Sequence, residues 1–208
     1  MTNSNNFKSQ VAPTWCPGCN NYLLSAGLQS AFKTLGYESN NLAIAYDIGC
    51  VGNMADFIHS YSIHALHGRT VPVAMGIKLA NPNLVVCVVG GDGGIYGEGL
   101  NHLIAAARAN SNIKVFVANN FLYSLTTGQT SPTTPKDAKT KSTPHGNLNQ
   151  PLDAVALINT VNSSVYARRV ESAKIPELNA AIIEALKFPG FALIEITQFC
   201  AAFGKQLL

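Results

Sequence analysis

The fold of this chain is decided by the stretch Leu84-Val85-Val86-Cys87-Val88-Val89-Gly90-Gly91-Asp92-Gly93-Gly94. Its first six residues are apolar without alternation, which is typical of a strand buried on both faces of a parallel sheet. An alanine-rich segment follows, and a second apolar run at residues 113–118 leads into Asn119-Asn120. Crossovers between parallel strands are right-handed, so the two strands are expected to lie side by side or nearly so. Asp92 and Asn120 would then share the carboxyl edge of the sheet, where ligands bind.

The residue types at this edge suit a diphosphate held through a metal ion. Glycines around Asp92 let the backbone approach a ligand and adopt positive φ at low cost, and a helix starting near Tyr96 would direct free N–H groups at a phosphate. A carboxylate and an amide oxygen are hard ligands suited to Mg²⁺, which also takes phosphate oxygens. A lone Gly-Asp-Gly would indicate only a tight turn. The paired Asn119-Asn120, one strand–helix–strand unit later, favours the metal site.

The alternation of strand and helix patterns predicts an α/β fold: three α/β/α layers, a mostly parallel sheet and one domain over residues 1–208. Strands are expected at residues 42–46, 84–89, 113–118, 164–170 and 191–197, and helices at about 21–35, 72–80, 96–109, 153–158 and 175–187. Residues 1–14 are expected to be irregular, and residues 47–69 show no regular pattern. A Thr-, Gly-, Ser- and Pro-rich loop is expected at about 124–150, and loops of this length are usually functional lids or binding loops.

Composition restricts the class of protein. Charged residues make up 12% of the 208 residues, against about 25% in typical soluble domains. This favours a surface covered by partner subunits over an apolar-rich monomer. The net charge of +3 is scattered without aromatic interleaving, so no nucleic-acid partner is expected. No apolar run has membrane-spanning length, and residues 1–10 lack a signal-peptide core, which predicts a cytoplasmic protein without a membrane partner.

The five cysteines divide into one core thiol and four candidate ligands. Cys87 lies inside an apolar strand and is expected to be inert. Cys16, Cys19, Cys50 and Cys200 allow three interpretations: a zinc site, a thioredoxin-like redox pair, or a [4Fe–4S] cluster. The redox pair is disfavoured because its motif should follow a strand. Spacing alone places the cluster only slightly ahead of zinc, so both remain open.

The histidines do not form an obvious metal site. His59, His64 and His67 follow the spacing H-x4-H-x2-H, which does not place all three on one helical face, and no carboxylate partner is evident. His67, followed by Gly68-Arg69, is better placed to meet an anionic ligand. No G-x-S-x-G, Walker A or G-x-G-x-x-G motif occurs, so hydrolase, P-loop and dinucleotide functions have no support.

Several motifs together resemble a known family over nearly the whole chain. They are Trp15-Cys16-Pro17-Gly18-Cys19, Ile48-Gly49-Cys50, His64-Ala65-Leu66-His67-Gly68-Arg69, Pro72-Val73-Ala74, Gly76-Ile77-Lys78-Leu79-Ala80-Asn81-Pro82, Gly91-Asp92-Gly93 and Tyr123 through Thr134. In this combination and order they resemble the β subunit of 2-oxoacid:ferredoxin oxidoreductases, especially those acting on 2-oxoglutarate or on 2-oxoacids broadly. The resemblance implies a thiamine diphosphate-binding fold of the pyrophosphate-binding type.

The resemblance also implies roles for individual residues. Mg²⁺ would be held by Asp92, Asn120 and the backbone carbonyl of Leu122. Positions matching those that line the cofactor are Ile48, Gly49, Cys50, Val51, His67, Gly91, Gly93, Gly94, Ser124 and Leu125, with His67 the candidate catalytic residue on the thiamine and substrate side. The four cluster ligands would be Cys16, Cys19, Cys50 and Cys200, which would join the N-terminal segment to the C-terminal end at a [4Fe–4S] cluster. Thr127 lies where the family sets substrate preference.

The activity implied is the coenzyme A-dependent oxidative decarboxylation of a 2-oxoacid to acyl-CoA, CO₂ and reduced ferredoxin. 2-Oxoglutarate is the favoured substrate, and pyruvate or a branched-chain or aryl 2-oxoacid is the alternative. An α subunit would supply the pyrimidine-binding domain and an activating Glu, in an αβ unit or a dimer of such units, with or without further small subunits. This chain alone would be inactive.

Three positions depart from the family pattern. Gly94 stands where the family commonly has the second Asp of Gly-Asp-Gly-Asp, and Val51 stands where Ser commonly follows Cys50. Asn53 lies where an Arg or Lys is often found. These departures bear on substrate and coenzyme A handling. They are also the only support for a rival function, a non-redox thiamine-dependent decarboxylase or an assembly subunit with structural zinc.

Overall fold

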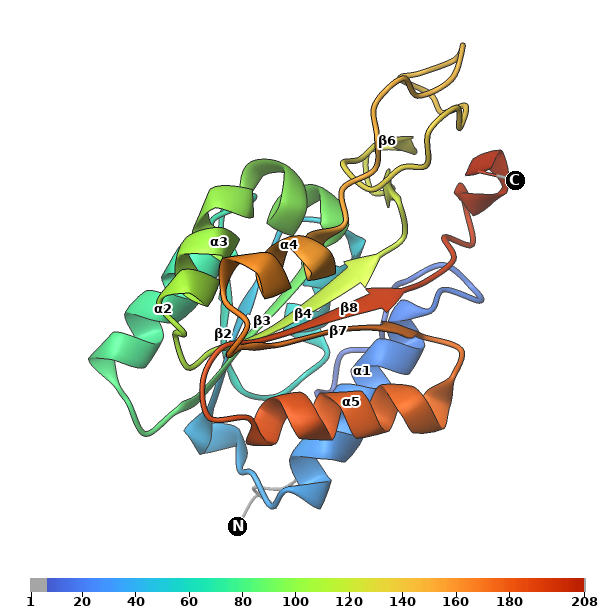
Figure 1. The fold of residues 1–208 in the computed structure, drawn as a ribbon. Helices are drawn as coiled ribbons and strands as arrows, with labels where there is room; N and C mark the ends of the chain where they lie inside the picture. The colour runs from blue at the N-terminus through green and yellow to red at the C-terminus, as the bar shows by residue number, and fades with distance from the viewer. Residues whose placement is uncertain (1–6, 208) are drawn as a thin grey trace.

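Six parallel strands form the centre of the computed structural model, which describes residues 7–207 (Figure 1). Their order across the sheet is β2 (Tyr61–His64), β1 (Leu42–Tyr46), β3 (Val85–Gly91), β4 (Lys114–Asn119), β8 (Ala192–Thr197) and β7 (Tyr166–Glu171). Strands β3 and β4 are direct neighbours, with Cys87 opposite Lys114. The predicted adjacency of the two decisive strands is therefore confirmed.

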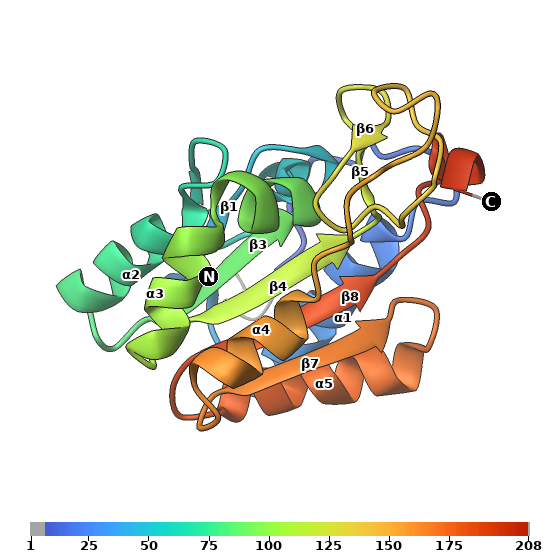
Figure 2. The same ribbon diagram turned by 45° about the horizontal axis from the view of Figure 1, so that its top comes forward.

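Helices cover both faces of the sheet and bury two apolar layers (Figures 1 and 2). Helices α1 (Asn21–Thr34) and α5 (Ile175–Lys187) pack on one face, and α2 (Thr70–Ala80), α3 (Leu100–Arg108) and α4 (Ala154–Val161) pack on the other. Alternate residues of β1 separate the layers: Ile44 packs with α1 and α5, and Ala45 packs with α2 and α3. The three-layer α/β fold predicted from the alternation of patterns is confirmed.

The helix expected at residues 96–109 begins earlier and in another form. A π-helical turn, η3 (Gly93–Glu98), precedes α3 and is closed by a hydrogen bond of 2.8 Å from Gly99 N to Gly94 O. A Cβ atom on Gly99 would lie 2.8 Å from that same oxygen, so the wide turn depends on the missing side chain. Short 3₁₀ helices are η1 (Ser39–Asn41), η2 (Cys50–Asp56) and η4 (Gly204–Leu207).

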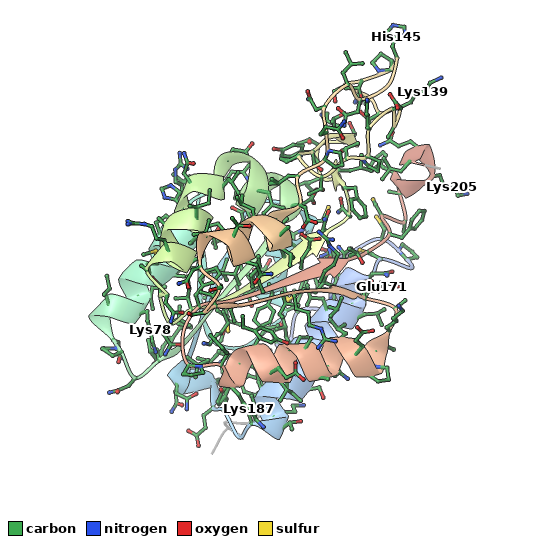
Figure 3. The ribbon with its side chains drawn as sticks, in the orientation of Figure 1. Lys78, Lys139, His145, Glu171, Lys187 and Lys205 are labelled. Atoms are coloured by element: carbon green, nitrogen blue, oxygen red, sulfur yellow. The ribbon has the colours of Figure 1, made fainter. Side chains whose placement is uncertain are left out.

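Strand β2 was not predicted, because all four of its side chains are exposed and it therefore lacks an apolar pattern. The loop expected at residues 124–150 is also more ordered than its composition indicates. A short hairpin, β5 (Leu122–Tyr123) with β6 (Gln129–Thr130), opens it, and the Thr130 hydroxyl is hydrogen-bonded to those of Thr140 and Thr143. The segment projects from the body, with Lys139 and His145 near its tip (Figure 3).

Residues 7 and 8, in the segment expected to be irregular, pack against the body of the protein. Phe7 is fully buried, and Lys8 forms an isolated antiparallel bridge with Ile58. Residues 1–6, part of the polar N-terminus considered above, lie outside the described residues. No helix within residues 7–207 combines the length and apolar character needed to cross a membrane.

A buried carboxylate in the sheet leads to a stability prediction. Glu195 is 1% exposed and receives hydrogen bonds from Tyr96 and Arg169. Arg169→Met would leave this charge buried without its cation, so we expect the free energy of unfolding to fall by about 2–3 kcal/mol, less than for a fully buried pair because Arg169 is part-exposed. Arg168→Met is the matched control, since its ion pairs with Glu177 and Glu184 are exposed and contribute little. If urea denaturation gave equal losses of unfolding free energy for the two variants, the stabilising role of the Arg169–Glu195 pair would be contradicted.

Candidate active site

A pocket opens at the carboxyl edge of the sheet, over the ends of β1, β3 and β4. The chain passes from β1 to β2 on one side and to β3 on the other, so this is a topological switch point where α/β sheets bind ligands. The cavity of about 120 Å³ is lined by Asn21, Ile48, Gly49, Cys50, Val51, His67, Gly91, Asp92, Gly93, Gly94, Ala118, Asn120, Leu122, Tyr123, Ser124, Leu125, Thr126 and Gln198. All the residues expected to contact thiamine diphosphate or Mg²⁺ are among them.

Asp92, at the end of β3, is a buried carboxylate within this pocket. It is 1% exposed, and its Oδ2 accepts hydrogen bonds from the hydroxyls of Ser131 and Thr133. The backbone N–H of Asn120 also donates to this carboxyl group, so the structure brings together the two residues from successive strand ends. Burial raises the pKa of Asp92 to about 6, although these hydrogen bonds act in the opposite direction. A bound cation would stabilise this charge, so the site fits a metal ion.

The two adjacent asparagines after β4 have different surroundings. Asn119 is buried, and its Oδ1 accepts from the backbone N–H of Phe121 and shares the single hydroxyl hydrogen of Thr133 with Asp92. Asn120 lines the pocket, and its Oδ1 accepts from Leu122 N at 3.0 Å and Ser124 Oγ at 3.1 Å. Because an amide oxygen has two lone pairs, coordination of a metal by this atom requires one of these donors to move away.

His67 lies between two carboxylates, contrary to the expectation that it has no carboxylate partner. Its Nδ1 lies 3.4 Å from Asp47 Oδ2, and its Nε2 lies 3.5 Å from Glu98 Oε2. The hydroxyl of Tyr123 donates to Glu98 Oε1 at 3.1 Å. Sequence reasoning missed all three neighbours. Asp47 carried a usable signal, since it follows β1 directly, as Asp92 follows β3.

The thiol groups expected to hold a cluster come from three parts of the chain. The loop before α1 and the segment after β8 meet at the carboxyl edge (Figures 1 and 2), and the thiols of Cys16, Cys19 and Cys200 all interact electrostatically with Cys50. Burial, followed by these neighbouring thiolates, raises the pKa of Cys50 to about 11. Cys87 lies fully buried in the core, as expected.

These thiols are not arranged around a single ion. Within residues 7–207, no group of three His, Cys, Asp or Glu side chains is placed to hold one metal ion. Four thiolates that repel one another need positive charge between them, and a cluster of several irons places its ligands farther apart than one ion does. A [4Fe–4S] cluster would need all four of these thiolates as ligands.

Thr127 lies outside the pocket, which is lined by Thr126 instead. Its φ of 81° is uncommon for a residue with a branched side chain. Its Oγ1 accepts a hydrogen bond of 2.6 Å from Lys141 of the projecting segment. Other lining residues that sequence reasoning missed are Asn21, Ala118, Thr126 and Gln198. Asn21 and Gln198 are joined by a hydrogen bond of 2.8 Å between α1 and the end of β8, a contact without a local sequence signal.

Comparisons with known proteins agree with this geometry. Residues 47–196 match the family model "Thiamine pyrophosphate enzyme, C-terminal TPP binding domain". The chain is 40% identical over 203 residues to the 2-oxoacid:ferredoxin oxidoreductase 2, subunit beta, of Aeropyrum pernix, covering 96% of this chain and 64% of the relative. It is 38% identical over 195 residues to the 2-oxoglutarate synthase subunit KorB of Archaeoglobus fulgidus, covering 93% of this chain and 72% of that relative.

A solved structure is also similar. It is the 2-oxoglutarate:ferredoxin oxidoreductase from Magnetococcus marinus with 2-oxoglutarate, coenzyme A and succinyl-CoA bound. The TM-score is 0.92 at 34% identity, and the match covers 98% of this chain and 70% of that one. The present chain thus spans about two thirds of the length of the relatives it matches.

Proposed function

This chain belongs to the family of 2-oxoacid:ferredoxin oxidoreductase beta subunits and has their thiamine pyrophosphate-binding domain, and on that premise we propose its reaction. Together with an α subunit, it catalyses the coenzyme A-dependent oxidative decarboxylation of a 2-oxoacid to acyl-CoA, CO₂ and reduced ferredoxin. 2-Oxoglutarate is the favoured substrate, because relatives named for 2-oxoglutarate and a similar structure with 2-oxoglutarate, coenzyme A and succinyl-CoA support it.

The observation that carries this proposal is the convergence of Asp92 and Asn120 in one glycine-lined pocket. Asp92, the Asn120 amide and the Leu122 carbonyl hold Mg²⁺, which would neutralise the diphosphate. Gly93 makes room for the ring of Tyr123, which a Cβ atom there would overlap, whereas Gly49 and Gly91 leave open space for the ligand. Thiamine diphosphate, when bound, supplies the electron sink for loss of CO₂.

Cys50 belongs both to the cofactor pocket and to the set of four cysteines proposed to hold the cluster. It lines the pocket, and its thiol interacts with those of Cys16, Cys19 and Cys200. The indole of Trp15 donates a hydrogen bond of 2.6 Å to the carbonyl of Cys50, which holds the N-terminal cysteine segment against this loop. A [4Fe–4S] cluster on these four thiolates would accept electrons one at a time, next to the thiamine site.

The α subunit covers the open side of the pocket. Ile48 and Leu125 line the pocket, yet their side chains are 39% and 51% exposed. Apolar side chains that are exposed beside a site indicate a surface completed by a partner. Ferredoxin is the electron acceptor in this proposal.

Metal content tests the redox part of the proposal. We expect anaerobically purified protein to be brown, with about four irons and matching sulfide per chain. The visible absorption of the cluster should bleach with 2-oxoglutarate and coenzyme A only after the α subunit is added. Colourless protein containing zinc would remove the electron-transfer step and favour the non-redox rival. Full turnover by this chain alone would contradict the need for an α subunit.

A further inference from the structure

Asp47, which no step above uses, is a fully buried carboxylate beside His67. Its Oδ1 accepts hydrogen bonds from Gly68 N at 2.9 Å and from Thr70 Oγ1 at 3.0 Å, so the side chain is fixed at the start of α2. Its Oδ2 and the Nδ1 of His67 are both buried, and neither has a hydrogen-bond partner within residues 7–207. They face each other at 3.4 Å.

Gly94 makes room for this carboxylate. A Cβ atom on Gly94 would overlap Asp47 Oδ2 and would lie 2.8 Å from His67 Nδ1. Gly94 does not have a positive φ, so its backbone conformation does not require glycine. The absence of a side chain at this position is therefore explained by the space that Asp47 occupies.

We propose that Asp47 is the positioning residue for His67, and that Gly94 is its necessary complement. The carboxylate of Asp47 enters from the end of β1 and fills the volume that a side chain at position 94, after β3, would otherwise occupy. This gives a physical reason for the missing second Asp of Gly-Asp-Gly-Asp: the charge comes from the neighbouring strand. The inference rests on the proposed function only in assigning the pocket to thiamine diphosphate.

The remaining contacts of His67 fix its other side. Its Nε2 faces Glu98 Oε2 at 3.5 Å, and the ring of Tyr123 meets it edge-on with 6.1 Å between ring centroids. Both carboxylates can only accept a hydrogen bond, but Asp47 is fully buried whereas the side chain of Glu98 is 44% exposed to water. A proton on Nδ1 would therefore satisfy the two buried atoms that otherwise lack a partner. A fixed ring orientation directs the exposed part of His67 into the pocket, where it can contact a ligand.

An exchange of the two residues tests the pairing. Gly94→Asp should lower the Mg²⁺-dependent affinity of the complex with the α subunit for thiamine diphosphate, measured by calorimetry, because two side chains would occupy one volume. Adding Asp47→Gly should restore most of it, with a coupling of at least about tenfold between the two substitutions, as for residues in contact. Gly94→Ala in the Asp47→Gly background is the matched control, since it fills the space without a charge and should not restore full affinity. Independent, multiplicative effects would overturn the pairing.

The state of the His67 ring gives a readout that needs neither cofactor nor partner. In ¹⁵N-histidine NMR spectra of the full chain, assigned with His67→Gln, the proton is expected on Nδ1. Asp47→Asn should move it to Nε2, because the amide can present a donor to Nδ1. His102 is an internal control, as its Nε2 lies 3.2 Å from Arg69 and not near Asp47. An unchanged tautomer would overturn the inference. Failure of the unmodified chain to bind thiamine diphosphate in the presence of its α subunit would instead overturn the proposed function.

Discussion

Asp92→Ala is expected to abolish Mg²⁺-dependent binding of thiamine diphosphate. The carboxylate is the only negatively charged ligand proposed for the metal, and it is held in a pocket where burial raises its pKa to about 6. Loss of an outer partner of a metal site commonly lowers affinity by about 10- to 100-fold, so loss of a direct ligand should lower it by at least about 100-fold. Calorimetric titration with and without Mg²⁺ measures the effect, and the iron content should not change.

Two variants separate the metal from the fold. Asp92→Asn removes the charge but keeps one acceptor oxygen, which can replace Oδ2 in accepting from the hydroxyls of Ser131 and Thr133. It should therefore remain folded and still lose Mg²⁺-dependent affinity. Asp153→Ala removes another carboxylate, one that caps α4 through Ala156 N, and should cost about 1 kcal/mol of stability without affecting cofactor binding. Unchanged affinity in both Asp92 variants would rule out the metal assignment.

The two strand-end residues could be predicted from sequence because their positions follow from strand order alone. Continuous apolar runs indicated buried parallel strands, and parallel strands place Asp92 and Asn120 at one edge. The same argument applies to Asp47 at the end of β1. The contact of His67 with Glu98 could not be predicted in this way, because it depends on the π-helical turn η3, and the glycine-rich sequence there also suits a simple loop.

The cysteines show a different limit of sequence reasoning. Spacing left zinc and a cluster nearly equal, because Cys200 lies far along the chain from Cys16 and Cys19 and no local pattern connects them. Strands β1 and β8 are parallel members of one sheet, so both end at its carboxyl edge. Only this tertiary arrangement places Cys200 near Cys19 and Cys50. The hairpin of β5 and β6 was missed for a related reason: its strands have two residues each, too few to show a period.

Cys200→Ala is expected to remove the iron–sulfur cluster while leaving the thiamine site intact. This cysteine follows the last strand and interacts with Cys19 and Cys50, so its loss would leave three thiolates for a cluster that needs four. The protein should lose its brown colour, and its iron should fall from about four per chain to near zero. Thiamine diphosphate affinity should stay within about threefold of the unmodified chain, because Cys200 does not line that pocket.

Cys87→Ala is the matched control, because it also removes one thiol but from the middle of β3. Cys87 is fully buried, and burial raises its pKa to about 12, so it stays a neutral thiol in the core and is no ligand. This variant should lose about 1 kcal/mol of stability yet keep its full iron content. If it lost iron as Cys200→Ala does, the loss would reflect general destabilisation and the ligand assignment would be wrong. If both variants retained a single zinc, the four thiols would have a structural role, and the non-redox rival would replace the proposed reaction.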